Sequence, residues 1–411
     1  MLVAVVMLFV VGAMAALSID VVTLYTARSE AQLAADGAAL AAARVLANSG
    51  ATSDTTGGSM ASAWNLAKAV AIQVATQNKV GGTNLTPAEV TPSGPGGTNT
   101  DPTVTVVVQK NDLPTFFARI WGTRTVTVKA SATAEAYNPS GARALGGTNP
   151  VKTTCVKPWL LPNKDPSNSD NPIFATTTGA INPGSTLLGW SFTSPTGKQM
   201  SLNPACAGAG GCILPQAAPP SWNYFPGDEA TTFPHPTNSL PSCLPALTSN
   251  YQEAVAGCIE IAISCNSPAN IDTNAYAGNR NSDTADAVNC LTHATNNQGD
   301  TVASPVPPVS PFQFIAGVDN PVAATAGKNV MVSDSLVTVP VFDSSGGAAA
   351  TVQIIGFVQL FLNPDGLATL PSGNVNTTVV NLAGCGTGAT GTPPILGNGA
   401  SPVAVRLISP P

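Results

Sequence analysis

The chain has 411 residues, of which 44% are hydrophobic and only 9% are charged, against about a quarter in an average soluble domain. Its formal net charge of −6 argues against a nucleic-acid-binding surface, which needs clustered Lys and Arg to neutralise phosphates. With 38 Gly and 36 Pro, the sequence predicts many turns and loops, and its length allows two or three domains.

Residues 1–19 contain no charged side chain and are dominated by Val, Leu, Ala, Met and Phe. A helix rises about 1.5 Å per residue, so this stretch nearly spans the roughly 30 Å hydrocarbon core of a bilayer. Its apolar character covers every face, which disfavours the buried helix of a soluble domain. We expect a helix that crosses a membrane once.

The competing interpretation is a signal peptide that is cleaved after export. Ala13-Met14-Ala15 fits the small-x-small site that such a peptide needs. The helical pattern continues without a breaker through residues 18–24, however, which favours a retained anchor. The first basic residue is Arg28, so no Lys or Arg precedes the apolar run to orient it by the positive-inside rule. We therefore expect a natural start further upstream that supplies basic residues.

Beyond this span, residues 20–47 form an Ala-rich segment that reads as helix. Alanines recur there at helical spacing: Ala27, Ala31, Ala34, Ala35, Ala38, Ala39, Ala42 and Ala43. Small residues at such spacing let two backbones approach closely, and Ala has the best helix propensity. The sequence leaves open whether this face packs on the protein's own domain or on a partner subunit.

The next stretch predicts a helix on an antiparallel sheet. Residues 60–80 form a second helix with one broad apolar face, and residues 91–100 are expected to be a Pro/Gly linker. Alternating apolar residues predict strands at 104–108 and 124–137, with a short helix and turn over 113–122 between them. A long helix on such a sheet would be pilin-like in outline.

From residue 150 to about residue 303 the chain is rich in Pro, Asn, Ser, Gly and Thr, and few regular elements are expected. Pro340 lies late in one of the strands expected further on, which suits a sheet edge. These strands either complete the first sheet or form a second layer. They are predicted at 329–332, 336–342, 351–362, 375–382 and 403–408.

The fold class that follows is α+β, with an N-terminal transmembrane or long helix, a pilin-like antiparallel sheet and a large loop-rich, disulfide-containing insert. We expect four parts along the chain. They are a membrane anchor with its Ala-rich helix (1–47), a helix with antiparallel strands (48–140), a Pro/Asn/Gly-rich region with cysteines (141–303) and a β-rich C-terminal region (304–411).

Seven of the eight cysteines lie in the loop-rich region. An even count behind an export segment predicts disulfides, because exported domains fold in oxidising compartments. Cys206 with Cys212 and Cys258 with Cys265 are favoured as local pairs, and the other pairings stay open. No pair has the Cys-x₂₋₄-Cys spacing of a zinc site, so we expect no metal.

The sequence shows no recognisable catalytic constellation. It has no Gly-x-Ser-x-Gly elbow, no His-Glu-x-x-His, no Walker loop and no dinucleotide-binding glycine fingerprint. His235 and His293 lie far apart in sequence, so a histidine-based triad has no support. Asp272, Asp283 and Asp286 carry oxygens that suit calcium, but they lack the EF-hand register and favour a solvated loop. We predict no catalytic residue and no cofactor.

The residues around the end of the apolar span resemble a known family. Residues 17–28 read Leu-Ser-Ile-Asp-Val-Val-Thr-Leu-Tyr-Thr-Ala-Arg, and residues 32–44 read Gln-Leu-Ala-Ala-Asp-Gly-Ala-Ala-Leu-Ala-Ala-Ala-Arg. This order is similar to the N-terminal segment of TadE/TadG-like proteins of bacterial Flp pilus (tight-adherence) assembly systems. Pro-Thr-Phe-Phe-Ala-Arg at 114–119 also resembles the region after the anchor in that family. The motif positions are Asp20, Leu24, Tyr25, Arg28, Ala35 and Asp36.

The resemblance implies a non-enzymatic, membrane-anchored structural component of a Flp/Tad-type pilus assembly or adhesion apparatus. It implies a single pass through the bacterial inner membrane, with the bulk of the chain in the periplasm or cell exterior. Its partners would be other pilus-assembly or pilin-like proteins, with no nucleic acid and no small-molecule substrate. The alternative is a secreted or cell-surface binding protein, released by cleavage near Ala15, that adheres through residues 151–300.

Overall fold

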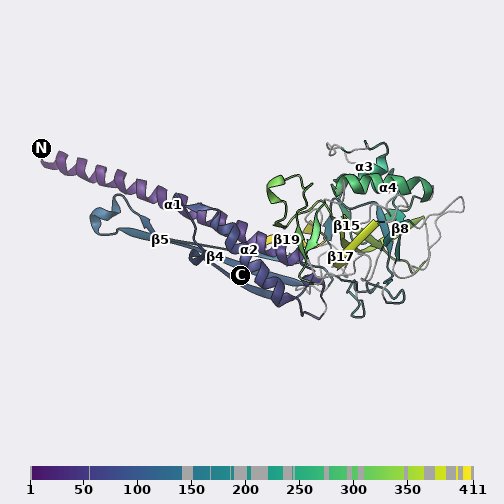
Figure 1. Ribbon diagram of the computed structural model, residues 1–411. Coiled ribbons are helices and arrows are strands. Elements are labelled where there is room, and N and C mark those ends of the chain that lie inside the picture. The colour runs from purple at the N-terminus through teal and green to yellow at the C-terminus, as the bar shows by residue number, and fades with distance from the viewer. Residues whose placement is uncertain are drawn as a thin grey trace.

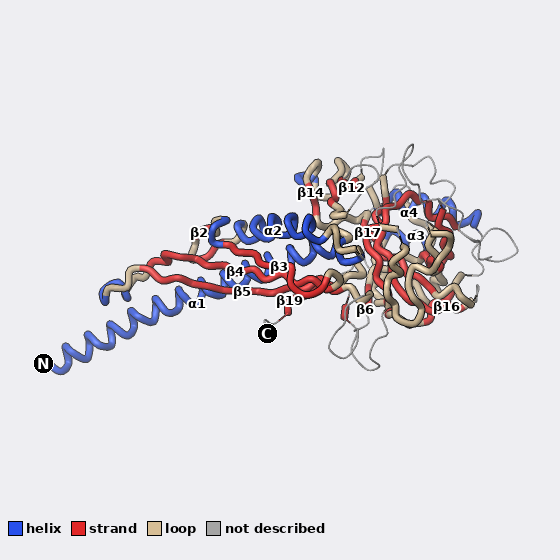
Figure 2. The backbone as a smooth tube through the Cα atoms, turned by 90° about the horizontal axis from the view of Figure 1, so that it is seen from below, coloured by secondary structure: helices blue, strands red, loops and turns tan. Residues whose placement is uncertain are grey.

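The computed structural model shows a long N-terminal helix, a narrow stalk built on that helix and a wider C-terminal head (Figures 1 and 2). We call residues 20–137 together with strand β19 the stalk, and the described residues between 151 and 396 the head. The structure describes residues 2–54, 56–140, 151–166, 168–185, 187–188, 201–204, 221–234, 243, 246–272, 277–293, 299–303, 310–346, 350–364, 375–385, 395–396 and 401–408.

Helix α1 (Leu2–Asn48) is continuous from its start to the head. No proline interrupts it, and its Ala-rich second half has high helix propensity. Its first part projects beyond the rest of the molecule (Figure 1). This helix is long and apolar enough to cross a membrane, and only 11% of its most apolar window is buried in the protein. Apolar side chains along the projecting part are exposed: Val3, Met7, Leu8, Val10, Val11, Met14, Leu17 and Ile19.

The second half of α1 lies on a four-stranded antiparallel sheet with strand order β19-β5-β4-β3. The strands are β3 (Val90–Thr98), β4 (Asp101–Pro114), β5 (Thr125–Tyr137) and β19 (Ala404–Ile408). Helix α2 (Met60–Thr76) packs against α1 and β3. Smaller elements are η1 (Ala51–Ser53), β1 (Lys79–Val80), β2 (Thr83–Asn84), η2 (Pro87–Glu89) and η3 (Ala118–Trp121).

The alanine face of α1 is buried inside the stalk. All eight of the alanines that recur between residues 27 and 43 are at most 3% exposed and belong to one core with α2 and the sheet. Ala63, Ala67, Ala71 and Ala75 of α2 face them, so backbones rather than large side chains approach closely. The face that the sequence left unassigned thus packs on the protein's own domain.

The stalk differs from the sequence prediction at residues 91–100, which form strand β3 and its turn instead of a linker. Val90 pairs with Val108 of β4, and the register shifts between Ser93 and Gly96. Proline is tolerated in β3 because this strand lies at the edge of the sheet and has an unpaired side. The predicted helix over 60–80 also ends earlier, at Thr76.

In the head, a seven-stranded sheet has the order β11-β16-β15-β7-β9-β8-β17. Pairing of β16 with β17 closes six of these strands into a ring, and β11 is attached to β16 outside it. The three long strands were expected at these places, and the sequence's α+β class is confirmed. Helices α3 (Asn250–Ala256) and α4 (Ala277–Leu291) pack together beside the ring. The strands are β7 (Trp159–Pro162), β8 (Ser201–Pro204), β9 (Ser221–Pro226), β11 (Pro268–Asn270), β15 (Leu336–Phe342), β16 (Thr351–Leu362) and β17 (Val375–Gly384).

Two three-stranded sheets complete the head. One joins β6 (Val151–Thr153) to β10 (Ile263–Ser264) and β18 (Ile395–Leu396). The other has the order β12-β13-β14 and lies nearest the stalk (Figure 2). Its strands are β12 (Thr301–Ala303), β13 (Gln313–Ile315) and β14 (Asn329–Val330), and η5 (Ala323–Thr325) precedes the last of them.

The expectation that Pro340 marks a sheet edge is wrong, since β15 lies between β16 and β7. The carbonyls of Thr338 and Phe342 accept hydrogen bonds from the N–H groups of Lys157 and Asn163. Alternate residues of a strand face the same neighbour, so the missing N–H of Pro340 faces the β7 side. That side of β15 is only partly hydrogen-bonded, because β7 pairs with β15 only at Val341 and Phe342.

Three disulfides lie in the head: Cys155–Cys258, Cys243–Cys290 and Cys265–Cys385. The predicted local pairing of Cys258 with Cys265 is therefore wrong, although both residues are in disulfides. The reason is tertiary: antiparallel pairing of β10 with β6 brings Cys155 beside the end of α3, where Cys258 lies. Cys206 and Cys212 lie outside the described residues.

Candidate functional site

The membrane-proximal end of the stalk is organised around Asp20, the first charged residue after the apolar span. Its carboxylate accepts hydrogen bonds from the backbone N–H groups of Phe116, Phe117 and Ala118, at 2.8, 2.9 and 2.6 Å. These residues join β4 to η3, so the carboxylate caps the start of that short helix as an N-cap side chain would. Asp20 is only 3% exposed. We call this arrangement the Asp20 cap.

The other motif residues divide between two faces of α1. Ala35 is fully buried, and Leu24 packs against the stalk core. Asp36 accepts a hydrogen bond from Gln32, whose side-chain amide also donates to the Ser131 carbonyl of β5.

Two motif residues point away from the stalk. Tyr25 is 76% exposed, and Arg28 is exposed and has no hydrogen bond or ion pair within the described chain. Asp20, Leu24 and Ala35 therefore hold the helix to the stalk, and Asp36 accepts a bond from the Gln32 amide that contacts β5. The motif leaves Tyr25 and Arg28 available to other molecules.

The opposite end of α1 enters the head through a buried polar cluster that we call the junction. Asn381 of β17 donates hydrogen bonds from its side-chain amide to the Ala47 carbonyl and to Gln359 Oε1, both at 2.6 Å. Its Oδ1 lies 3.2 Å from the Ser53 hydroxyl. Asn138, at the end of β5, donates to the carbonyls of Thr52 and Leu382.

Gly50 makes the close turn between α1 and η1 in the junction. Its φ of 80° lies in the left-handed region that favours glycine. A Cβ at this position would lie 2.6 Å from the ring of Phe312 and 2.8 Å from the Val380 carbonyl oxygen. The Phe312 N–H also donates to the Ser49 carbonyl. The stalk and the head are thus joined by buried hydrogen bonds and close packing.

A groove of about 350 Å³ lies between α1, α2 and the β12–β14 sheet. Its walls are largely apolar, with Leu66, Val70, Phe312 and Phe314 among them, and Arg44 reaches into it. Arg44 is half-buried and makes no ion pair within the described residues. Burial lowers the pKa of its guanidinium.

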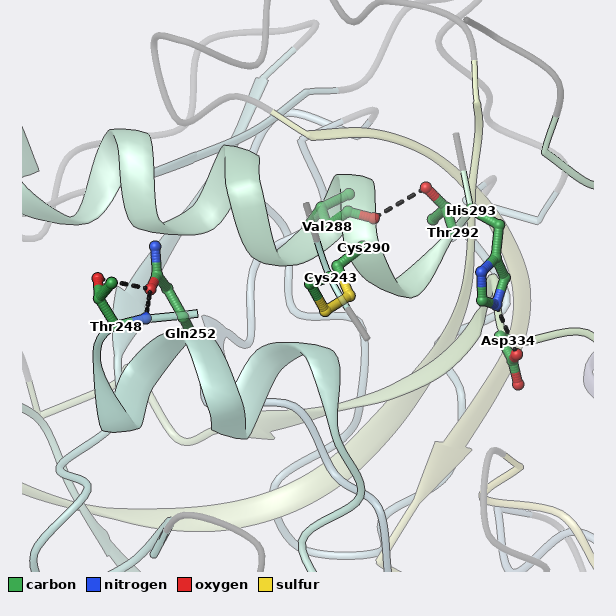
Figure 3. Close-up of a disulfide and its surroundings, with 8 residues drawn as sticks. All are labelled: Cys243, Thr248, Gln252, Val288, Cys290, Thr292, His293 and Asp334. Carbon is green, nitrogen blue, oxygen red and sulfur yellow. Dashed lines mark hydrogen bonds and ion pairs between the residues drawn. A yellow bond between two sulfur atoms is a disulfide. The ribbon is translucent and has the colours of Figure 1, made fainter. Parts of the chain in front are cut away.

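Titratable groups in the head are held in structural contacts. His293 forms an ion pair with Asp334 at 3.1 Å, at the end of α4 and close to the Cys243–Cys290 disulfide (Figure 3). The hydrogen bond to Asp334 raises the pKa of His293. Lys157 is buried and donates to the Gly257 carbonyl at 2.6 Å, and burial lowers its pKa to about 7.

The acidic residues considered for calcium also make protein contacts. Asp283 accepts a hydrogen bond from Ser249 and Asp286 from Gln252, which ties α4 to α3. Asp272 lies beside residues 273–276, which the structure does not describe, and His235 is likewise outside the described residues. Within the described chain no group of three His, Cys, Asp or Glu side chains is placed to hold a metal ion.

Sequence reasoning did not find the partners of Asp20 or the junction asparagines. The Pro-Thr-Phe-Phe-Ala-Arg motif that holds the three N–H donors was visible, but nothing in the sequence linked it to Asp20, about 96 residues earlier. Asn381 gave a weak signal as a polar residue that interrupts an apolar strand.

Comparison with known proteins identifies one segment. Residues 1–45 match the family model described as putative Flp pilus-assembly TadE/G-like. No curated protein and no solved structure matches the chain. The expected resemblance is confirmed over this segment, which holds the apolar span, the Asp20 cap residue and the alanine face. The first 45 residues of this protein thus match the TadE/G-like Flp pilus-assembly family model, and the match does not extend to the rest of the chain.

Proposed function

We propose that the protein is a membrane-anchored structural component of a bacterial Flp/Tad-type pilus assembly, with residues 1–19 in the inner membrane. The observation that carries this proposal is the division of α1 at Asp20. Before Asp20 the large apolar side chains that the structure describes are exposed, and after it the alanine face is buried. Exposed apolar side chains over the length of a bilayer are stable in lipid and costly in water.

The contacts support a mechanical role rather than a catalytic one. Helix α1 runs unbroken from the proposed membrane segment to the junction, where buried hydrogen bonds hold the head. The disulfides support a head in an oxidising compartment, which in a bacterium means the periplasm or the exterior. The head would thus be held at a fixed distance from the membrane.

The outward face of α1 is the surface proposed for other pilus-assembly or pilin-like proteins. Val22, Tyr25 and Leu33 recur at helical spacing and are 64%, 76% and 69% exposed. Exposed aromatic and branched apolar side chains on a helix suit packing against a second amphipathic helix. Arg28, on the same part of the helix, adds a charge that selects an acidic partner.

Complementation of a deletion strain tests this function. We expect cells that lack the gene to lose Flp pili, and the wild-type gene to restore them. A variant in which residues 1–19 are replaced by an efficiently cleaved signal peptide should export the head but fail to restore pili. Pili restored by that released form would overturn the anchored role and favour a secreted binding protein. Tyr25→Ala with Leu33→Ala tests the partner face, with the exposed pair Val318→Ala and Val322→Ala of the head as the matched control.

A further inference from the structure

We propose that the loop between β4 and β5, residues 115–124, is a second membrane contact that lies in the headgroup layer of an anionic phospholipid bilayer. We call this loop the tip. The proposal rests on the proposed function, because it requires that residues 1–19 lie in a bilayer. It adds to that function a second membrane-binding surface, the class of lipid that it binds and a role for the Asp20 cap.

The position of the tip follows from its attachment to α1. The Asp20 cap fixes residues 116–118 to the helix directly after the apolar span. Figures 1 and 2 both show the end of the β4–β5 hairpin lying beside the projecting part of α1, far from the head. A bilayer that surrounds residues 1–19 therefore has its surface at the tip.

The side chains of the tip suit a membrane interface. Phe116 is 62% exposed although it is a large apolar residue. Both charged side chains of the tip, those of Arg119 and Arg124, are exposed and make no ion pair or hydrogen bond within the described chain. Aromatic side chains favour the headgroup region, and each Arg near the surface is attracted to anionic lipids.

Backbone N–H groups of the tip are hydrogen-bonded within the protein, which suits a loop at a membrane interface. The N–H groups of residues 116–118 donate to Asp20, and that of Thr115 donates to the Arg124 carbonyl. The N–H groups of Gly122 and Thr123 donate to carbonyls of residues 119 and 118. Pairing of backbone groups is obligatory only in the hydrocarbon core, but it lowers the cost of placing this loop at the interface, where backbone groups lose part of their water. The same bonds satisfy the Asp20 carboxylate, which would otherwise be costly beside a bilayer.

The test uses the full-length protein in vesicles of phosphatidylcholine, with or without phosphatidylglycerol. An environment-sensitive fluorophore is attached at Phe116→Cys, and the matched control carries it at Val318→Cys, an exposed apolar position in the head. We expect the tip probe to be quenched by headgroup-labelled lipids and to be shielded from aqueous iodide about threefold or more relative to the head probe. Equal iodide access at the two positions would overturn the proposal.

Charge-reversal variants test whether the tip prefers anionic lipids. Arg119→Glu with Arg124→Glu should remove the extra shielding that phosphatidylglycerol gives, whereas Lys328→Glu in the head should leave it unchanged. Shielding that is the same in neutral and anionic vesicles would refute the anionic headgroup as the partner. Vesicle flotation separates the two proposals. Protein that fails to float refutes the anchor, and floating protein with an accessible tip probe refutes this inference alone.

Discussion

Replacing Asn381 with alanine should loosen the junction between the stalk and the head. The substitution removes two hydrogen bonds of 2.6 Å, to the Ala47 carbonyl and to Gln359, and the 3.2 Å contact with Ser53. Each buried bond contributes about 1 kcal/mol net, and a buried group left unpaired costs about 1–3 kcal/mol. Because Asn381 is fully buried, water does not replace the lost partners. We expect a loss of about 3–5 kcal/mol in the stability of the junction.

Hydrogen exchange of the full-length protein in detergent measures this loss locally. Amides of residues 47–53 should exchange about 100-fold faster or more in Asn381→Ala, since about 1.4 kcal/mol corresponds to a factor of ten. Ser53→Ala removes hydrogen bonds of the same cluster, with Asn381, Asn138 and Leu382, and should speed the exchange of these amides as well. Asn111→Ala removes an exposed asparagine of β4 and should change stability by less than about 0.5 kcal/mol. An Asn381→Ala protein that exchanges like Asn111→Ala would refute the reasoning.

Three further predictions concern the head and the junction. Gly50→Ala should lower the melting temperature by several degrees, because its φ of 80° and the nearby Phe312 ring leave no room for a Cβ; an unchanged melting curve would contradict this. The pKa of His293 is raised by its ion pair with Asp334, so this pair stabilises the folded protein fully below about pH 6.5. The stabilisation is lost as pH rises through the folded-state pKa, and His293→Gln should abolish this decline in the free energy of unfolding measured by urea titration. Lys157, with its pKa lowered to about 7, binds fewer protons when folded than unfolded between pH 7 and 10.5. Stability should therefore increase across that window, and an equal slope in Lys157→Met would show that another group causes it.

The elements found from sequence are those with a local cause. Residues 336–342 and 351–362 form strands at the predicted bounds, because runs of β-branched and aromatic side chains specify a strand wherever it pairs. The Ala-rich helix over 27–43 was found for a similar reason, since both its propensity and its spacing are visible in the sequence.

The elements missed are those decided by tertiary contacts. Strand β3 contains prolines and glycines and forms because β4 offers a partner along its length. Helix α4 is polar in sequence and is held by packing and hydrogen bonds to α3. The disulfide of Cys265 joins it to a residue 120 positions away, which no local spacing reveals. The Asp20 cap belongs to this class as well.

The retention of residues 1–19 in a membrane is the central claim, and fractionation of the native full-length protein tests it most directly. Membranes are washed with alkaline carbonate, and the protein's intact mass is measured from the pellet and the supernatant. We predict full-length protein in the pellet, with its head cysteines oxidised and residues 1–19 still present. Soluble protein that begins near Ala16 would contradict the anchor and would identify the first segment as a cleaved signal peptide.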